Sequence, residues 1–435
     1  QMTTVAVLGG GIGGLAASYY LCKNPQVTKV IVLESSSRFG GWLWSTRRSD
    51  GAIFEHGPRG IRPAGAVGRN TLNMVEDLGL SGEILPVTYS DVASKNRYLY
   101  VNGRLCRMPS GISGIVRTVS PFSRPILLSM LSEIFVKKSK QEDESIHSFV
   151  SRRLGAELAD IAVDSLCRGV FAGDCRKLSI RSCFPPLYKL RLVPSQNASL
   201  NTSSRAGECS STETQPLHRS SPRPLGGRSI RLEGDGVVSA DHVIAALPAK
   251  ALSSVLPPSC QPLIQQLQDI STVTVAVVNL EYDGDSLLPV VGFGHLLPSS
   301  EDPGLLGIVY DSVAFPQQNK PNGQTTRLTV MMGGAWFQEA FGSPEAVTEE
   351  RLLARATEAV QRHLGISAAP CWSKVALHQD CIPQYHLGHF SRVESMRAFI
   401  RKNDLALSLI GASYDGVSVN DVIFSGRTAV QELLS

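Results

Sequence analysis

A glycine-rich turn near the start of the chain has the residue types and spacing that bind a dinucleotide. The apolar run 5–8 leads into this turn, and a second apolar run, 30–33, ends on Glu34. A strand, a glycine turn, a helix and a strand closed by an acid form the βαβ unit that sets a pyrophosphate against a helix N-terminus. The Glu34 carboxylate then stands where it can accept hydrogen bonds from a ribose. The turn consists of Gly9, Gly10, Gly11, Ile12, Gly13 and Gly14.

A second glycine pair, Gly40-Gly41, lies between Arg38 and Trp42, soon after Glu34 and Ser35. This arrangement resembles the second signature of the FAD-dependent amine oxidases and desaturases, so it favours FAD over NAD. The Arg38 guanidinium can reach a phosphate, and the small glycines let a backbone approach. Without the first motif, the pair would be an ordinary surface turn.

Two further arginines are candidates for binding. The loop Gly57-Pro58-Arg59-Gly60 is stiff and cationic, suited to run past an isoalloxazine ring. Arg97 begins a predicted strand, 97–101, that enters a hairpin at Asn102-Gly103, a pair that favours a type I′ turn. Arg97 could meet an anionic substrate there. For both arginines, a solvated surface charge is the alternative.

The C-terminal segment predicts a strand, a turn and a helix. The strand covers 407–410, and Ser418 with Asp421 forms a capping box at the start of a helix with one apolar stripe. We expect the N-terminal end of this helix to lie under a flavin, where its dipole would stabilise negative charge. A plain packing helix is the alternative and is compatible with that role.

Composition describes an ordinary globular chain of 435 residues, 43% hydrophobic, with room for two or three domains. A net charge of +4 is too weak to favour nucleic acid as a partner. The nine cysteines are scattered without a C-x-x-C pair, which predicts reduced thiols and no metal site. His295, His378, His386 and His389 also lack metal-ligand spacing, so we expect them to be structural or exposed.

Four further stretches stand out. Residues 110–136 are mostly apolar but are interrupted by basic residues. No uninterrupted apolar run among them reaches the roughly 20 residues of a membrane span. They fit an interfacial surface or an ordinary core helix equally well. Residues 189–229 are rich in serine and proline without any period, which predicts disorder. Residues 241–248 predict a strand that rejoins the parallel sheet, and Ser343-Pro344 predicts the start of a helix that ends at Gly365.

The chain as a whole resembles the protoporphyrinogen oxidases of animals, over residues 3–187 and about 240–435. Long stretches carry this resemblance, and they are far more specific than the glycine turn: 57–63, 164–174, 178–185, 307–316, 381–389 and 411–421. The segment 189–229 departs from the family, which has an apolar helical run, a paired-glycine helix start and a strand there.

The resemblance implies which residues bind. FAD contacts fall on residues 9–14, and an arginine that holds a propionate of the tetrapyrrole falls on Arg97. The remaining implied FAD contacts are Glu34, Ser35, Trp42, Gly57, Pro58, Arg59, Gly60, Val417, Ser418 and Val419. Apolar clamps for the macrocycle fall on Leu296 and Met331.

The implied activity is the oxidation of protoporphyrinogen IX to protoporphyrin IX in haem synthesis, with dioxygen as acceptor and hydrogen peroxide as product. Three rounds on FAD remove six electrons, and no protein nucleophile is needed. The resemblance also implies a homodimer bound peripherally to the mitochondrial inner membrane, on its intermembrane-space side.

The expected fold class is α/β: a Rossmann-like FAD-binding domain, a mixed α+β substrate domain and a helical membrane-docking region. FAD binding is assigned to residues 1–90, 230–250 (a sheet strand) and 376–435. The membrane-docking and substrate region covers 91–188, the disordered insert 189–229, and the substrate-binding domain 251–375.

Two alternatives remain open. The chain could be another flavin oxidase of the same group, acting on amines or carotenoids. Amine oxidases usually carry an acidic Gly-Glu where this chain has Gly411-Ala412-Ser413-Tyr414. The chain could also be an inactive or flavin-poor variant of the oxidase, because the altered segment 189–229 replaces folded elements of the family.

Overall fold

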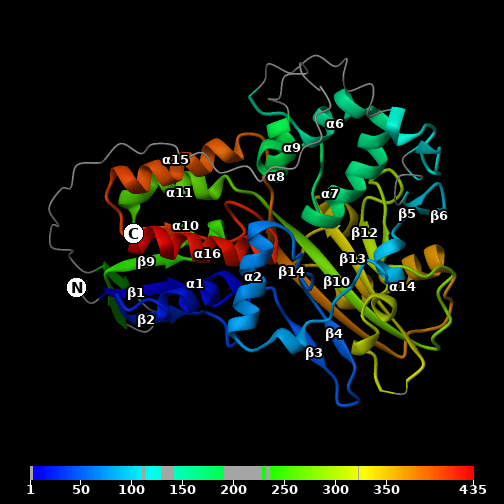
Figure 1. Ribbon diagram of the computed structural model, residues 1–435, viewed down its shortest axis with the longest axis horizontal. Coiled ribbons are helices and arrows are strands. Elements are labelled where there is room, and N and C mark those ends of the chain that lie inside the picture. The colour runs from blue at the N-terminus through cyan, green and yellow to red at the C-terminus, as the bar shows by residue number, and fades with distance from the viewer. Residues whose placement is uncertain are drawn as a thin grey trace, which may run out of the picture.

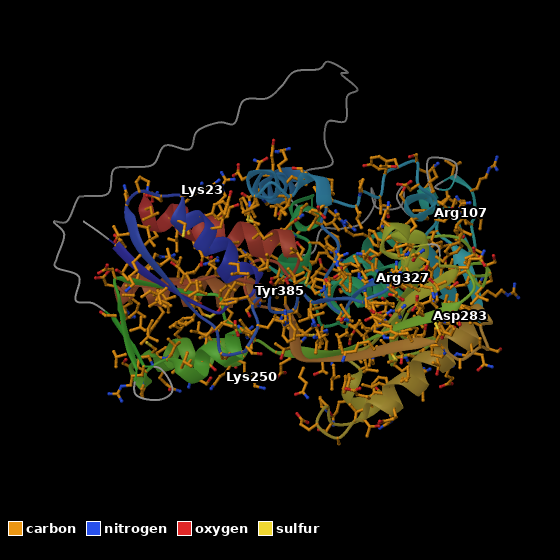
Figure 2. The ribbon with its side chains drawn as sticks, turned by 90° about the horizontal axis from the view of Figure 1, so that it is seen from below. Lys23, Arg107, Lys250, Asp283, Arg327 and Tyr385 are labelled. Carbon is orange, nitrogen blue, oxygen red and sulfur yellow. The ribbon has the colours of Figure 1, made fainter. Side chains whose placement is uncertain are left out.

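The described residues form two large β-sheets at opposite ends of an elongated molecule, with helices packed around both, and two smaller two-stranded sheets, β3-β4 and β7-β8 (Figure 1). The computed structural model describes residues 3–109, 114, 116–128, 142–190, 228–231, 236–321 and 323–435. Figure 2 shows Lys23 and Asp283 towards opposite ends and Tyr385 near the middle. Tyr385 is buried, and its hydroxyl donates to the Ala412 carbonyl.

The first sheet is parallel and has four strands in the order β15-β9-β1-β2. Its strands are β1 (Thr3–Leu8), β2 (Val27–Leu33), β9 (His242–Ala245) and β15 (Leu407–Leu409). Val5 of β1 pairs with Val30 of β2 on one side and with His242 of β9 on the other. The strand predicted within 241–248 therefore does lie beside β1. A fold of this kind buries apolar strands from both sides.

Helices cover both faces of this sheet. One core joins β1 to α1 (Ile12–Cys22) and α16 (Val419–Leu434), with α2 (Gly65–Asp77) packed against both helices. On the other face, a second core joins β9 and β15 to α10 (Ala249–Val255), α11 (Gln261–Gln268) and α15 (His389–Lys402). Ile244 belongs to the first core and Ala245 to the second, as the alternation of side chains along a strand requires.

The second sheet has seven strands in the order β14-β10-β13-β12-β11-β5-β6. Its neighbours pair antiparallel except β11 with β5. The helix α14 (Glu349–Leu364) covers one face through the largest apolar core. The strands are β5 (Tyr98–Val101), β6 (Arg104–Arg107), β10 (Thr272–Asp283), β11 (Gly294–Leu296), β12 (Leu305–Val309), β13 (Thr325–Gly334) and β14 (Trp372–Pro383).

Two details of this sheet bear on the predictions. The hairpin between β5 and β6 turns at Asn102 and Gly103, both at positive φ, which confirms the predicted type of turn. The strand β14 runs across the expected domain boundary at 375/376, so the seven-stranded sheet extends to Pro383. The other expected domain boundaries stay predictions.

A group of helices packs beside the second sheet. They are α6 (Ile146–Leu154), the π-helical turn η3 (Leu158–Val163), α7 (Asp164–Phe171), α8 (Ile180–Cys183) and α9 (Pro185–Leu190). No helix among the described residues has both the length and the apolar character of a membrane span.

The remaining elements are short. They are β3 (Ser45–Arg47), β4 (Ile53–Glu55), β7 (Arg228–Arg231), β8 (Val237–Ala240), α3 (Val92–Lys95), α12 (Asp311–Ala314) and α13 (Phe337–Phe341). Three single 3₁₀ turns complete the described elements: η1 (Ser81–Glu83), η4 (Pro258–Cys260) and η5 (Pro316–Gln318).

Some predictions fall on residues that the structure does not describe. The predicted ends of the disordered segment also need correction. About half of the stretch 110–136 (residues 110–113, 115 and 129–136) and nearly all of 189–229 lie outside the described residues. At its described ends the predicted disordered insert is wrong: Lys189 lies in α9, and Arg228 pairs with Ala240 as β7 meets β8. Pro185 is the first residue of α9, a position that suits proline because its missing N–H would have no partner there.

The start of α14 was also predicted too early. Thr348, and not Ser343, is the N-cap, and its hydroxyl accepts the Arg351 N–H at 3.3 Å. Two glutamates follow Thr348, where they meet the positive end of the helix dipole. The predicted end holds, because Gly365 takes the left-handed C-cap conformation.

The turn between β1 and α1 depends on glycine at two places. Gly9 has φ +99°, a conformation that side chains disfavour. At Gly14, an added Cβ would lie 1.9 Å from the Gly9 carbonyl oxygen, so the helix can approach the turn only without a side chain there. The two positions together let α1 start directly beneath the end of β1.

We therefore expect Gly14→Ala to destabilise the chain by about 1–3 kcal/mol, because the methyl group must push α1 away from the turn. Thermal unfolding, monitored by circular dichroism, measures the effect. Gly82→Ala is the matched control, since a Cβ at Gly82 meets nothing within 4 Å. Equal unfolding temperatures for the two variants would contradict the close approach.

Candidate cofactor and substrate site

A single cavity of about 3300 Å³ runs between the two sheets. Its walls include most of the residues that the sequence singled out, from the glycine turn to Arg97. The predicted residues on the wall are Gly9, Gly11, Ile12, Gly13, Glu34, Ser35, Trp42, Gly57, Pro58, Arg59, Gly60, Arg97, Leu296, Met331, Val417, Ser418 and Val419. Gly10 and Gly14 are not on the wall, and they act by packing behind the turn.

The two glycine motifs meet at one end of the cavity. The Gly40 N–H donates to the Gly10 carbonyl at 2.9 Å, and Gly11 and Gly40 form a parallel bridge. An added Cβ on Gly41 would come within 3.1 Å of the Gly11 Cα. The second glycine pair therefore lets its loop pack directly on the first turn, beside the N-terminus of α1.

Glu34 lies next to this junction. The Gly10 N–H donates to its Oε2 at 2.6 Å, and the Ser36 N–H donates to its Oε1 at 2.8 Å. Burial opposes the ionised form, but these backbone hydrogen bonds outweigh burial and lower the pKa of Glu34. The carboxylate is thus charged at neutral pH and faces the cavity as an acceptor.

Arg38 lies on the cavity wall and also holds its own loop, while its contact with a phosphate stays a prediction. Its guanidinium donates to carbonyls of its own loop, those of Phe39, Gly41 and Leu43. These hydrogen bonds close the loop around the second glycine pair. Arg38 therefore shapes the wall of the cavity by holding the loop, and its donors are largely occupied.

The loop 57–60 is tied to the second sheet. An added Cβ on Gly57 would lie 1.9 Å from the Trp42 carbonyl oxygen, so this loop too packs against the second glycine motif. The Arg59 guanidinium forms an ion pair with buried Asp311, which also accepts a hydrogen bond from Thr329 at 2.6 Å. Arg59 lies on the cavity wall with its charge neutralised by that pair.

The far end of the cavity is largely apolar and carries the cation Arg97. Arg97 precedes β5, with its guanidinium carbon 5.7 Å from the centre of the Phe293 ring. Within the described part of the chain, no carboxylate forms an ion pair with Arg97. Leu296 on β11 and Met331 on β13 line the same cavity.

Sequence reasoning missed a further part of the wall, which comes from one face of α7. Leu166, Gly169 and Val170 line the cavity there. An added Cβ on Gly169 would lie 2.7 Å from Leu296 Cδ1, so a side chain at 169 would displace the Leu296 side chain. The i, i+3, i+4 spacing of these residues was the available signal, because buried Arg168 and Phe171 occupy the other face.

The N-terminus of α16 closes the cavity near the glycine motifs. Val417, Ser418 and Val419 lie on the wall. The predicted capping box is confirmed, since the Ser418 hydroxyl accepts the Asp421 N–H at 3.2 Å and Asp421 accepts the Ser418 N–H at 3.2 Å. Two helix N-termini, of α1 and α16, therefore face the same cavity and favour negative charge within it.

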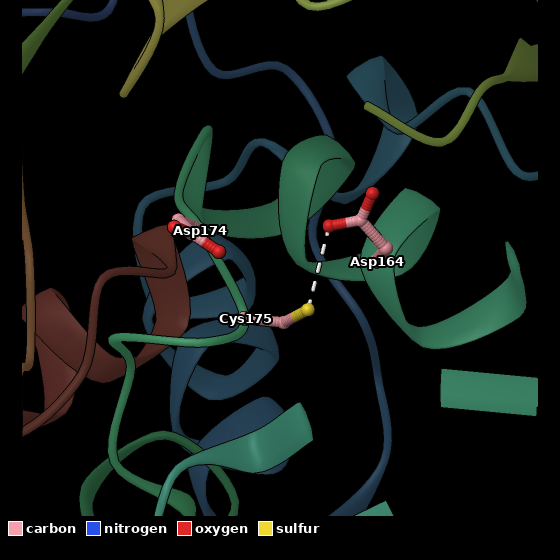
Figure 3. Close-up of side chains that lie close together, drawn as sticks. All are labelled: Asp164, Asp174 and Cys175. Atoms are coloured by element: carbon pink, nitrogen blue, oxygen red, sulfur yellow. Dashed lines mark hydrogen bonds between the residues drawn. The ribbon is translucent and has the colours of Figure 1, made fainter. Parts of the chain in front are cut away.

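One cluster outside the cavity has ligand-type atoms close together: Asp164, Asp174 and Cys175 (Figure 3). Asp164 accepts a hydrogen bond from the Cys175 thiol at 3.4 Å. Asp164 also accepts hydrogen bonds from the backbone N–H and the hydroxyl of Ser299, each at 2.7 Å. Burial raises the pKa of the Cys175 thiol, which favours its neutral form. These contacts tie α7 to the loop at Ser299. The eight described cysteines are all free thiols, as expected.

Comparison with known proteins agrees with this arrangement. The sequence profile of the "flavin containing amine oxidoreductase" family matches residues 12–200 and 213–434. The human protoporphyrinogen oxidase is 47% identical over 99% of this chain and 98% of its own, and that of Schizosaccharomyces pombe is 30% identical over 99% of both. A crystal structure of an Exiguobacterium protein, 20% identical, has the same fold, with a TM-score of 0.76 over 99% of this chain and 98% of its own.

The two glycine motifs meet beside a helix N-terminus, and one cavity continues from them to Arg97. Relatives match nearly the whole length of the chain. The chain belongs to the flavin-containing amine oxidoreductase family and, within it, to the protoporphyrinogen oxidases.

Proposed function

We propose that this chain is an FAD-dependent oxidase that converts protoporphyrinogen IX to protoporphyrin IX, with dioxygen as the electron acceptor. The observation that carries this proposal is the continuous cavity between the glycine motifs and Arg97. A cofactor held at one end and a tetrapyrrole held at the other would share one space. Membership of the protoporphyrinogen oxidases supports the same substrate and reaction.

The residues at the glycine end fit FAD. Gly9, Gly11 and Gly13 line the cavity, so backbone without side chains lies where a dinucleotide would bind. Glu34 offers an ionised acceptor for ribose hydroxyls, and the N-termini of α1 and α16 favour the pyrophosphate and a reduced, negatively charged ring system. When bound, FAD supplies the electron acceptor and dioxygen regenerates it.

The other end fits a tetrapyrrole with acidic side chains. The guanidinium of Arg97 stays charged and can pair with a propionate. The apolar side chains of Leu296, Met331, Leu166 and Val170 can cover the macrocycle from both sides and exclude water from it. These residues bind and orient the substrate, so that the same ring can react repeatedly without protein-bound intermediates.

Turnover is the direct test of this function. Purified protein should show flavin absorbance, and protoporphyrinogen IX added without oxygen should bleach it. In air, each protoporphyrin formed should consume three molecules of dioxygen, because six electrons leave the substrate in pairs. A colourless preparation would support the flavin-poor variant instead, and a flavoprotein bleached by amines but not by protoporphyrinogen would support an amine oxidase.

Arg97 should govern substrate affinity. We expect Arg97→Ala to raise the KM for protoporphyrinogen about ten- to a hundredfold, because it removes a charge-assisted hydrogen bond worth about 1.5–3 kcal/mol. The FAD content should stay at the wild-type level. Arg107→Ala is the control, since Arg107 is exposed on neighbouring β6 and does not line the cavity. An unchanged KM for Arg97→Ala would refute the role of Arg97.

We also propose a homodimer that binds peripherally to the mitochondrial inner membrane, on its intermembrane-space side. The family resemblance supports this, as does the exposure of Leu166 and Val170 beside the substrate end of the cavity. Full-length protein should float with cardiolipin-containing vesicles in a density gradient and elute as a dimer from a sizing column with light-scattering detection. A monomer that stays at the bottom of the gradient would contradict both statements.

A further inference from the structure

His378 lies on the wall of the cavity, between the two loops that carry the cofactor motifs. It belongs to β14 in the second sheet, where it pairs in register with Val275. Its spacing from other histidines suggested only a structural or exposed residue. The structure instead brings it against the segments around Trp42 and His56, which come from the opposite part of the chain.

The hydrogen bond to the His56 carbonyl determines which nitrogen of the His378 ring carries the proton. Nε2 of His378 lies 2.5 Å from the His56 carbonyl oxygen. A carbonyl can only accept, so Nε2 carries a proton. In the neutral ring Nδ1 is then a lone-pair acceptor. No group among the described residues donates a hydrogen bond to this Nδ1.

The carbonyl that His378 binds is itself fixed in place. The His56 ring is fully buried, and its Nδ1 donates to Asn279 at 2.6 Å. Its Nε2 meets the Thr46 hydroxyl at 2.6 Å, and its backbone N–H donates to the Trp44 carbonyl at 2.8 Å. The His56 carbonyl directly precedes Gly57, so His378 contacts the start of the loop 57–60.

The same imidazole supports Trp42. The two rings meet edge to face, with their centres 5.4 Å apart at 90°. Such a contact is favourable and defines the orientation of the indole. Burial lowers the pKa of His378, an effect larger than the opposing one of the His56 hydrogen bond, and nearby Arg38 lowers it further. The ring is therefore neutral at physiological pH.

We propose that His378 is a positioning residue of the FAD site, which holds Trp42 and the His56–Gly57 backbone together and offers Nδ1 as an acceptor to an N–H or O–H group of FAD. This inference rests on the proposed function, because it takes FAD as the ligand. It assigns a role to a residue of the second sheet, so that FAD binding draws on both halves of the molecule.

Two substitutions separate the parts of this role. In His378→Gln, the amide N–H can still donate to the His56 carbonyl, but the acceptor at Nδ1 is lost. In His378→Phe, the ring edge towards Trp42 remains, but both nitrogens are lost. Gln379→Ala is the matched control, because Gln379 is the next residue of β14, is exposed and does not line the cavity.

The experiment titrates FAD into flavin-free protein and follows quenching of flavin fluorescence, with thermal unfolding of each flavin-free variant measured in parallel. We expect the Kd for FAD to rise about fivefold in His378→Gln and further in His378→Phe, as expected for losing one and then two hydrogen bonds. His378→Gln should unfold near the wild-type temperature, and its bound flavin should show a displaced visible absorption band. Gln379→Ala should match wild type throughout.

A purely structural role would lower the unfolding temperature of both flavin-free variants and leave the Kd of the folded protein unchanged. That result, or wild-type Kd values in both variants, would overturn the inference while leaving the proposed function intact. A wild-type chain that binds no FAD would overturn the proposed function and this inference together.

Discussion

The site depends on how the short segment 53–56 docks on the seven-stranded sheet. Side chains within that sheet bind the backbone of this segment: Asn279 donates to the Glu55 carbonyl at 2.9 Å, and Arg327 donates to the Ile53 carbonyl at 2.8 Å. Both side chains are only 1% exposed. Leaving such buried donors without acceptors would cost about 1–3 kcal/mol each or more, so the segment has one favourable position. The fixed segment in turn determines where the next residues, the loop 57–60, lie.

This docking explains why one cavity can serve two ligands. The first glycine motif directly follows β1 of the first sheet, whereas Arg97 directly precedes β5 of the second sheet, in which Leu296 and Met331 lie. The loop 57–60 is in contact with both, through Trp42 on one side and the Arg59–Asp311 ion pair on the other. A shift of either sheet would break buried polar contacts at this loop. The separation between the two ends of the cavity is therefore defined by hydrogen bonds and an ion pair as well as by apolar packing.

Features that depend on neighbouring residues could be predicted from the sequence. The glycine turn, the Asn102-Gly103 hairpin and the Ser418–Asp421 capping box each follow from the conformations and hydrogen bonds of a few consecutive residues. Features that depend on distant partners could not. The pairing of Arg59 with Asp311 joins positions far apart in the chain, and nothing near Arg59 indicates that its charge is neutralised. His378 is a similar case, because its hydrogen-bond partner is a backbone carbonyl. Every residue has such a carbonyl, so the sequence does not indicate which one His378 contacts.

The contrast between Arg59 and Arg97 shows how the fold distributes charge along the cavity. Both arginines line it, and from sequence alone either could bind an acid. Asp311 neutralises Arg59, whereas Arg97 has no ion-pair partner among the described residues and lies beside the Phe293 ring. Arg97 is exposed, so water partly screens its charge, and it acts as an accessible cation and not as a buried one. The guanidinium of Arg97 is free to pair with a carboxylate, whereas that of Arg59 is already engaged by Asp311. Under the proposed function, the ion pair at Arg59 therefore leaves Arg97 as the better of these two arginines for a propionate of the substrate.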